Sequence, residues 1–240
     1  MAPNPVPGWE VGPPGAAAAY DPVAAMRLGW DRFVKDPATL LVPVIVGSVL
    51  QGLVLTLFFV GFVAVLLVAV GNSETSSSSG VADRTIAVVL VLGIAYVVAF
   101  AAFQIVYAGW IKGGLDIVAG KRPAFAELYA GWSKGAVFGA ALVLTALVWL
   151  GSFLWWLPSL AVVYFGQFAL HFMLDRGAGV VGACTGSARL VARNAAKVAL
   201  FDLLATAAVL AGTLAFGLGA FVAVPVVIIA QAHTFRVLAG

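Results

Sequence analysis

Six polar side chains lie within long apolar stretches of the sequence. They are Gln104, Gln167, His171, Asp202, Gln231 and His233. A polar group inside a bilayer is costly unless it has a partner, so these residues are the first candidates for a function. If the helices that carry them surround a common axis, their side chains could converge and line a polar path for a small solute or an ion.

A structural role is the alternative for each of these residues, and we favour it. A glutamine between two helices contributes about 0.6 to 2 kcal/mol through a hydrogen bond to a neighbouring backbone carbonyl. The glutamines also lie at unequal distances from the expected cytoplasmic ends of their helices, and Gln51 breaks the pattern. Asp202 lies near the start of its stretch, where the helix dipole favours an acid and where Lys197 or Arg193 is within reach. A proton or cation site at Asp202 is the alternative.

The residues that catalysis requires do not form a recognisable set. We find no paired acids, no histidine-rich metal motif, no glycine-rich phosphate loop and no Ser/His arrangement within the apolar stretches. His171 and Asp175 are four residues apart, but two ligands do not make a metal site. The sequence TGSA at 185–188 lies in a basic segment that we place at the membrane surface rather than in a buried site. We therefore expect no enzyme activity, no catalytic residue, no metal and no cofactor.

The composition is typical of an integral membrane protein. Hydrophobic residues make up 63% of the 240 residues, charged residues 10%, and the mean hydropathy is +1.09, whereas about a quarter of residues are charged in soluble proteins. Six apolar stretches are long enough to cross a bilayer as helices. They lie near residues 40–70, 86–111, 136–157, 159–174, 197–215 and 217–238. The fold class that we predict is an all-α membrane protein with six transmembrane helices arranged as three hairpins.

Basic residues precede alternate apolar stretches, and this pattern predicts the orientation. We expect those at the cytoplasmic face to contact anionic lipid headgroups or a partner: Arg27, Arg32, Lys35, Lys134, Arg189, Arg193 and Lys197. The positive-inside rule then places both termini in the cytoplasm, with the protein in the cell membrane. Because the basic residues follow the membrane topology, the pI near 9.2 does not indicate nucleic acid binding.

Residues 24–36 contain an amphipathic pattern directly before the first apolar stretch. Five apolar residues follow helical spacing on one face, and three charged residues lie four apart on another: Val23, Met26, Trp30, Phe33 and Val34, then Arg27, Asp31 and Lys35. Asp21 followed by Pro22 predicts the helix start. A helix with one apolar and one charged face next to a transmembrane segment is expected to lie in the cytoplasmic interface.

Two later segments resemble this one and suggest a threefold repeat. Residues 125–137 repeat the Gly-Trp pair, with Gly131-Trp132 matching Gly29-Trp30. Residues 182–194 place Val181, Cys184, Ala188 and Val191 on one face and two arginines on the other. We therefore divide the chain into a disordered Pro/Gly/Ala-rich tail at 1–20 and a membrane domain at 21–240, with units at 21–120, 121–178 and 179–240, each an interfacial helix and a hairpin. Selection for basic residues before each hairpin is the alternative explanation.

The Pro/Gly-rich tail, the Gly-Trp amphipathic segment and the six apolar stretches together resemble a broad group of bacterial, especially actinobacterial, six-helix membrane proteins. The group includes uncharacterised integral membrane proteins and the membrane domain attached to some glycerophosphodiester phosphodiesterases. The resemblance implies a membrane domain but no catalytic residues at these positions. We predict a non-catalytic scaffold or accessory subunit of the cytoplasmic membrane, with lipids and a membrane-protein partner or a second copy as partners. A transporter or channel lined by the glutamines and histidines is the alternative.

Overall fold

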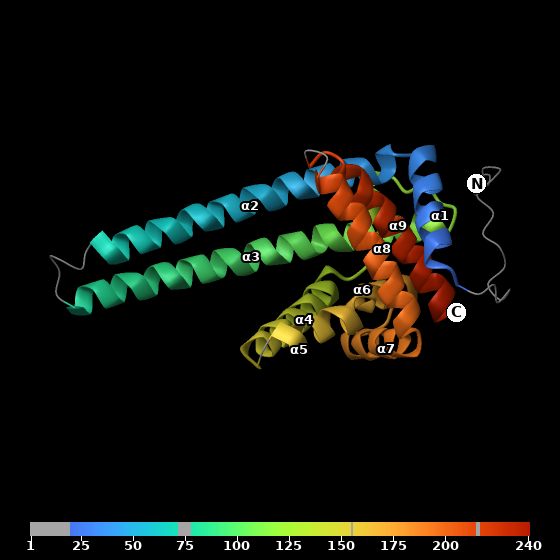
Figure 1. Ribbon diagram of the computed structural model, residues 1–240. Helices are drawn as coiled ribbons and strands as arrows, with labels where there is room; N and C mark the ends of the chain where they lie inside the picture. Colours follow the sequence, from blue (N-terminus) through green and yellow to red (C-terminus); the bar gives the residue numbers. More distant parts are fainter. Residues whose placement is uncertain (1–19, 72–77, 155, 215–216) are drawn as a thin grey trace. The chain divides into compact units, whose positions relative to one another are not determined.

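The computed structural model describes residues 20–71, 78–154, 156–214 and 217–240, and within these ranges every regular element is helical (Figure 1). The elements are α1 (Pro22–Lys35), α2 (Ala38–Gly71), α3 (Ser78–Val118), the 3₁₀ helix η1 (Phe125–Tyr129), α4 (Lys134–Leu154), α5 (Trp156–Gly166), α6 (Ala169–Arg176), α7 (Val180–Arg193), α8 (Ala195–Leu214) and α9 (Ala220–Ala239). The predicted tail lies outside the described residues except for Tyr20.

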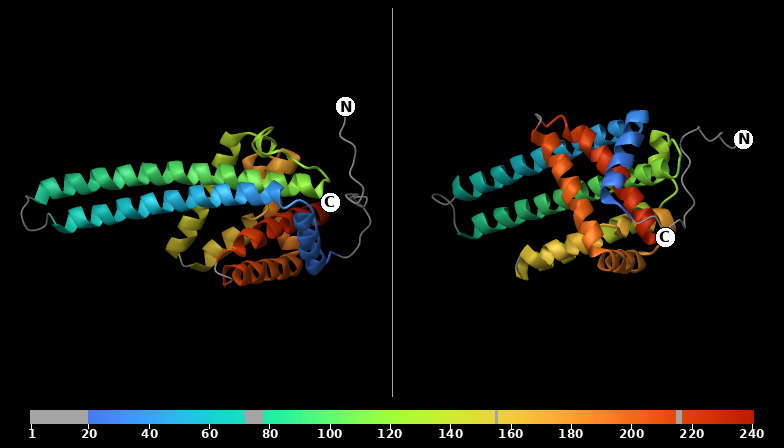
Figure 2. Two further views of the ribbon diagram at one scale, coloured as in Figure 1. Left: turned by 90° about the horizontal axis from the view of Figure 1, so that it is seen from above. Right: turned by 45° about the vertical axis from the view of Figure 1, so that its right-hand side comes forward.

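The chain divides into two compact units. The first comprises residues 1–45 and 105–240, and the second comprises residues 46–104. The described part of the second unit consists of the C-terminal part of α2 and the N-terminal part of α3, which lie side by side (Figure 2). Its described apolar side chains are largely exposed, for example Leu57 at 63%, Phe59 at 64% and Leu67 at 68%. Such a surface is suited to lipid rather than to water.

Four helical segments are long and apolar enough to cross a membrane, counting only residues that the structure describes. They are Ala38–Leu67, Leu157–Arg176, Ala195–Leu214 and Ala220–Ala239. These segments indicate a membrane protein. The predicted stretch at 86–111 falls in α3, and the stretch at 136–157 begins in α4 and extends to the start of α5. Both include positions outside the description, so the count of six and the three hairpins stay predictions.

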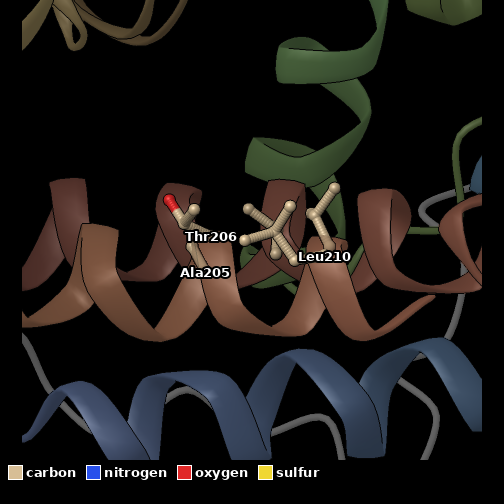
Figure 3. A pocket seen from close by; sticks show the side chains of 5 residues that line it. Ala205, Thr206 and Leu210 are labelled. Carbon is tan, nitrogen blue, oxygen red and sulfur yellow. The ribbon is translucent and has the colours of Figure 1, made fainter. Parts of the chain in front are cut away.

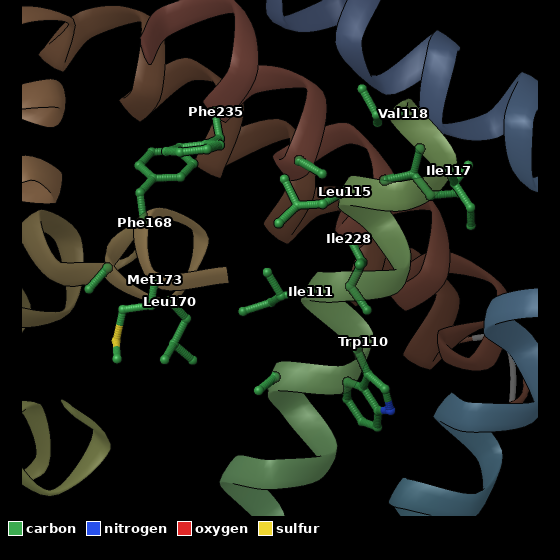
Figure 4. Packing of buried hydrophobic residues seen from close by; sticks show 14 of the residues in the cluster. Trp110, Ile111, Leu115, Ile117, Val118, Phe168, Leu170, Met173, Ile228 and Phe235 are labelled. Atoms are coloured by element: carbon green, nitrogen blue, oxygen red, sulfur yellow. The ribbon is translucent and has the colours of Figure 1, made fainter. Parts of the chain in front are cut away.

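The core of the first unit forms where α3, α6 and α9 meet. Figure 4 shows Ile111 and Leu115 of α3, Ile228 of α9, and the rings of Phe168 and Phe235 in this buried cluster. The two rings stack with their centroids 6.1 Å apart. Aromatic side chains bury large apolar areas, so this cluster fixes how α6 and α9 pack.

Helix α1 begins as the sequence predicts. The Asp21 carboxylate accepts a hydrogen bond from the Val23 N–H at 2.9 Å, and Pro22 occupies the first turn. The predicted apolar face is only partly correct, because α1 packs along α9 through a different set of residues. Ala25, Gly29, Arg32 and Phe33 are buried, whereas three residues of the predicted face are exposed: Val23 (41%), Trp30 (52%) and Val34 (57%).

The prediction of a second interfacial helix at residues 125–137 is wrong. Residues 125–129 form η1, and Gly131 then adopts a left-handed backbone with φ of 78° before α4 begins at Lys134. In α1, by contrast, Gly29 lies mid-helix, where an added Cβ would approach the Val226 carbonyl oxygen to 2.5 Å. The matching Gly-Trp pairs therefore have different structural causes, and the threefold repeat stays a prediction without their support.

Helix α7 confirms the third amphipathic segment, but its buried face is shifted. The buried residues are Ala183, Ser187, Leu190 and Val191, whereas Val181 is 76% exposed and Cys184 is partly exposed. The shift occurs because α7 packs against α5 and α6 with small residues, which allow close approach.

Candidate functional site at the break between helices α5 and α6

The predicted transmembrane stretch at 159–174 is interrupted. Helix α5 ends at Gly166 and α6 begins at Ala169, which leaves Gln167 and Phe168 between them. Glycine is a poor helix former, and at Gly166 the space of a Cβ is occupied by Leu144, 2.9 Å away. A helix break in the middle of a transmembrane stretch frees backbone N–H and C=O groups, and these groups need hydrogen-bond partners because water is scarce there.

Ser187 of α7 satisfies two of the freed backbone groups. Its hydroxyl donates to the Phe165 carbonyl oxygen at 2.6 Å and accepts from the Phe168 N–H at 3.0 Å, and the residue is fully buried. The expectation that Ser187 does not lie in a buried site is wrong, because α7 turns this side toward the protein interior. Its small neighbours Gly186 and Ala188 were the sole sequence signal of close packing.

Gln167 links the break to helix α8. Its side-chain amide donates to the Tyr164 carbonyl oxygen at 3.1 Å and to the Asp202 carboxylate at 2.9 Å. One glutamine thus satisfies a backbone acceptor at the end of α5 and holds an acidic side chain of the neighbouring helix. This is an interhelical contact of the kind that the sequence analysis favoured for the glutamines.

Asp202 is half-buried on α8, and its partner differs from the expected one. None of the ion pairs between described residues joins it to Lys197 or Arg193, which are both exposed. Its carboxylate accepts instead from Gln167. The two basic side chains remain at the surface because Asp202 lies one turn or more into the helix and faces α5 and α6.

Tyr20 lies near the same carboxylate. Its hydroxyl is 2.8 Å from the Thr234 hydroxyl on α9. Burial raises the pKa of Tyr20 to about 12, the hydrogen bond with Thr234 opposes the rise, and the negative charges of Asp202 and Asp21 add to it. Tyr20, which the sequence analysis assigned to the tail, therefore packs with the helices, and Asp202, Gln167, Tyr20 and Thr234 form a polar cluster.

His171 of α6 lies apart from this polar cluster. It is 1% exposed, and neither ring nitrogen has a hydrogen-bond partner among the described residues. Its ring packs against Phe168 and Phe235, at centroid distances of 5.5 and 5.3 Å. Asp175, four residues later, pairs with Arg236 at 2.6 Å. No group of three or more possible metal ligands occurs in the part of the chain that the structure describes.

The other predicted path residues are not brought together with these. Gln231 and His233 are half-buried in α9, and His233 lies within electrostatic range of Arg32. Gln104 is half-buried in α3 and belongs to the second unit, which is described by itself. Of the six residues, the structure joins Gln167 and Asp202, and a common polar path stays a prediction.

The basic residues predicted to face lipid or a partner fall into three groups. Exposed on their helices are Arg27, Lys35, Arg189, Arg193 and Lys197. Lys134 is exposed but engaged locally, because its ammonium donates to the Tyr129 carbonyl oxygen at 3.1 Å and lies 5.4 Å from the Trp132 ring centre. The prediction that Arg32 faces lipid or a partner is wrong, because Arg32 is 9% exposed and lies on the face of α1 that packs against α9. Burial lowers the pKa of its guanidinium group.

Surface cavities in the described part of the first unit include two that differ in lining. One, of about 300 Å³, lies between α8 and α9 and is lined by Ala205, Thr206, Val209, Leu210 and Val227 (Figure 3). The Thr206 hydroxyl is the single polar side-chain group among these lining residues. The groove is therefore suited to an apolar ligand such as a lipid acyl chain, and these residues offer no group for catalysis. The other, of about 160 Å³, is lined partly by arginines of α7.

Comparison with known proteins finds distant relatives in mycobacteria. The uncharacterized protein Mb2590 of Mycobacterium bovis is 28% identical over 225 residues, which cover 90% of this chain and 68% of the relative. The uncharacterized protein Rv2560 of Mycobacterium tuberculosis has the same identity and coverage. No family model matches the chain, and no solved structure is significantly similar to it. These relatives agree with the actinobacterial part of the resemblance and give no support to a link with glycerophosphodiester phosphodiesterases.

Proposed function

We propose that this protein is a non-catalytic integral protein of the cytoplasmic membrane, a scaffold or accessory subunit that presents a basic amphipathic surface to the cytoplasm. In this proposal the six apolar stretches cross the membrane, both termini are cytoplasmic, and α1 and α7 lie at the inner surface. The partners are anionic lipid headgroups together with a membrane-protein partner or a second copy of the chain.

The observation that carries the proposal is the outer face of α1. Packing against α9 uses Ala25 and Gly29, which leaves Val23, Trp30 and Val34 exposed on a second apolar stripe. Arg27 and Lys35 are exposed beside it. A helix that is already anchored on one side and still presents apolar and basic side chains on another is suited to the headgroup region or to a partner helix there.

The polar residues of the interior support a structural role rather than a reaction. Gln167 and Ser187 satisfy backbone groups at the helix break, and Gln167 also holds Asp202. Such contacts hold helices together. Catalysis needs converging groups around an accessible cavity, whereas the cavity between α8 and α9 is lined almost entirely by apolar side chains.

Native mass spectrometry of the protein, gently extracted from its host membrane with lipids and partners retained, tests this proposal. We expect a stoichiometric second protein. A variant with Val23→Ser, Trp30→Ser and Val34→Ser should lose that protein without a change in unfolding temperature, since these side chains are exposed. A discrete homo-oligomer without a foreign subunit would favour the transporter or channel considered next, and a monomer that retains neither a second protein nor a second copy would contradict the scaffold.

A transporter or channel is the second candidate, and Asp202 is the observation that favours it. An acidic side chain half-buried in an apolar helix beside a helix break is typical of ion and proton sites in membrane proteins. If Asp202 binds a proton or cation, Asp202→Asn should abolish the flux of that ion into liposomes that contain the protein. The asparagine carbonyl can still accept the hydrogen bond from Gln167. Gln51→Leu, outside the polar cluster, should leave the flux unchanged. Equal flux in Asp202→Asn and the unaltered protein would exclude this site.

A further inference from the structure

The cavity of about 160 Å³ lies between α7 and the end of α9. Its lining residues are Phe172, Gly186, Arg189, Leu190, Arg193, Asn194, Leu238 and Ala239. The volume is about five times the roughly 30 Å³ that one water molecule occupies in the liquid. We propose that this cavity is a binding pocket for a phosphate ester, with Arg189 and Arg193 as the phosphate ligands; this rests on the proposed placement of α7 at the cytoplasmic membrane surface.

The two arginines are positioned to act together. Arg189 and Arg193 are four residues apart, so they lie one turn apart on the same face of α7. Both line the cavity and are exposed. None of the ion pairs between described residues engages either guanidinium. The planar guanidinium group binds phosphate oxygens through two parallel hydrogen bonds, which makes arginine well suited to this ligand.

The start of helix α8 adjoins the cavity. Asn194, which lines the cavity, directly precedes α8, so the N-terminal end of a 20-residue helix adjoins the arginines. The first N–H groups of a helix have no intrahelical acceptor and favour anions. Asp175, the acid on the neighbouring helix α6, is already paired with Arg236. Arg176 donates to the carbonyl oxygens of Ala239 and Gly240 and thereby holds the end of α9 beside the pocket.

Apolar side chains form the part of the cavity wall opposite the charge-binding arginines in character, and they can contact the uncharged part of a ligand. Phe172, Leu190 and Leu238 form this part. An added Cβ at Gly186 would lie 3.3 Å from the Phe172 ring, so the missing side chain lets α7 approach that ring closely. A ligand with a charged phosphate and an apolar or uncharged ester group matches both parts of the wall. An anionic phospholipid and a soluble phosphate ester share this chemistry.

The test measures binding to the full-length purified protein in nanodiscs of phosphatidylcholine and phosphatidylglycerol at four to one. Native mass spectrometry counts the phosphatidylglycerol molecules that stay bound. The pocket variant is Arg189→Gln with Arg193→Gln. The control, Arg27→Gln with Lys35→Gln, removes the same charge from exposed positions on α1. Each basic side chain near an anionic surface contributes roughly a 5-fold gain in affinity, so the control is expected to lose up to about 25-fold. The pocket variant should lose at least about 10-fold more, because it also removes the hydrogen bonds of the two guanidinium groups to the phosphate.

The outcomes separate the ligand sources and the two proposals. If glycerol 3-phosphate or inorganic phosphate displaces the retained phosphatidylglycerol at equal concentration, the ligand is a soluble phosphate; if neither does, it is the lipid headgroup. An equal loss of lipid in both variants would overturn the pocket, because attraction would then be spread over the surface. The scaffold proposal fails separately, through absence of a partner protein in the host membrane, whatever lipid the pocket holds.

Discussion

The buried serine at the helix break shows what a single side chain contributes to this fold. Ser187 both donates and accepts, so one hydroxyl satisfies the carbonyl of Phe165 and the N–H of Phe168. Sequence alone did not reveal it, since residues 159–174 are almost uniformly apolar and contain no proline that would indicate a break. The partner also lies about 20 residues away, on a helix whose buried face was predicted one position off.

We predict that Ser187→Ala destabilises the protein by about 1 to 3 kcal/mol, because a backbone donor and acceptor would be left unsatisfied in a buried position. The measurement is unfolding of the purified protein in detergent. Thr185→Ala on the same helix is the matched control, since its exposed hydroxyl bonds only within α7. Its effect should stay within about 0.5 kcal/mol. Equal effects of the two substitutions would contradict the role of Ser187.

Tyr20 gives a prediction on pH dependence. The pKa of its phenol is raised to about 12 from an ordinary value of 10.0, so folding favours the neutral form. The stabilisation is fully present below pH 10 and is lost as pH rises through 12. Subtracting the phenolate absorbance of Tyr20→Phe from that of the unaltered protein should leave one group that titrates near 12. A difference that titrates at 10 would mean that Tyr20 is not packed against Thr234.

At the scale of elements, local signals were sufficient where they are strong. The Asp21-Pro22 pair gave the start of α1 correctly, and helical periodicity gave α7. The sequence did not predict correctly which face of α1 and α7 is buried, nor the structural role of Gly29 and Gly131. The small residues Ala25 and Gly29 are buried in α1 together with Arg32 and Phe33, and the small ones allow α9 to approach closely. Gly29 and Gly131 look alike in the sequence, although one permits helix packing and the other a left-handed turn.

We predict that Gly29→Ala destabilises the protein by about 1 to 3 kcal/mol, since the new Cβ would lie 2.5 Å from a backbone oxygen of α9 that cannot move freely. Gly182→Ala is the control, because a Cβ in α7 at that position meets nothing within 4 Å. It should stabilise the helix by roughly 0.5 to 1 kcal/mol. Thermal unfolding of both variants in one detergent measures the difference. A neutral Gly29→Ala would show that α1 does not pack closely on α9.

At the scale of the whole molecule, composition predicted a membrane protein, and the described residues support this class with four helical segments of membrane length. The polar path could not be judged from sequence, because convergence depends on how helices rotate about their axes. The break between α5 and α6 places Gln167 beside Asp202, whereas His171 packs among aromatic rings. The prediction of a basic cytoplasmic surface depends less on the orientation of each side chain. It requires only that the exposed arginines and lysines of α1 and α7 lie on the same side of the membrane.

The most direct test of this account is the side of the membrane on which α1 and α7 lie. Cys184 is the single cysteine, so Cys184→Ala gives a background free of thiols. Into it, Lys35→Cys on the charged face of α1 or Val181→Cys on α7 introduces one thiol at an exposed position. We predict that a membrane-impermeant maleimide labels neither thiol in intact cells and both after permeabilisation. Labelling of either thiol in intact cells would contradict a shared cytoplasmic face.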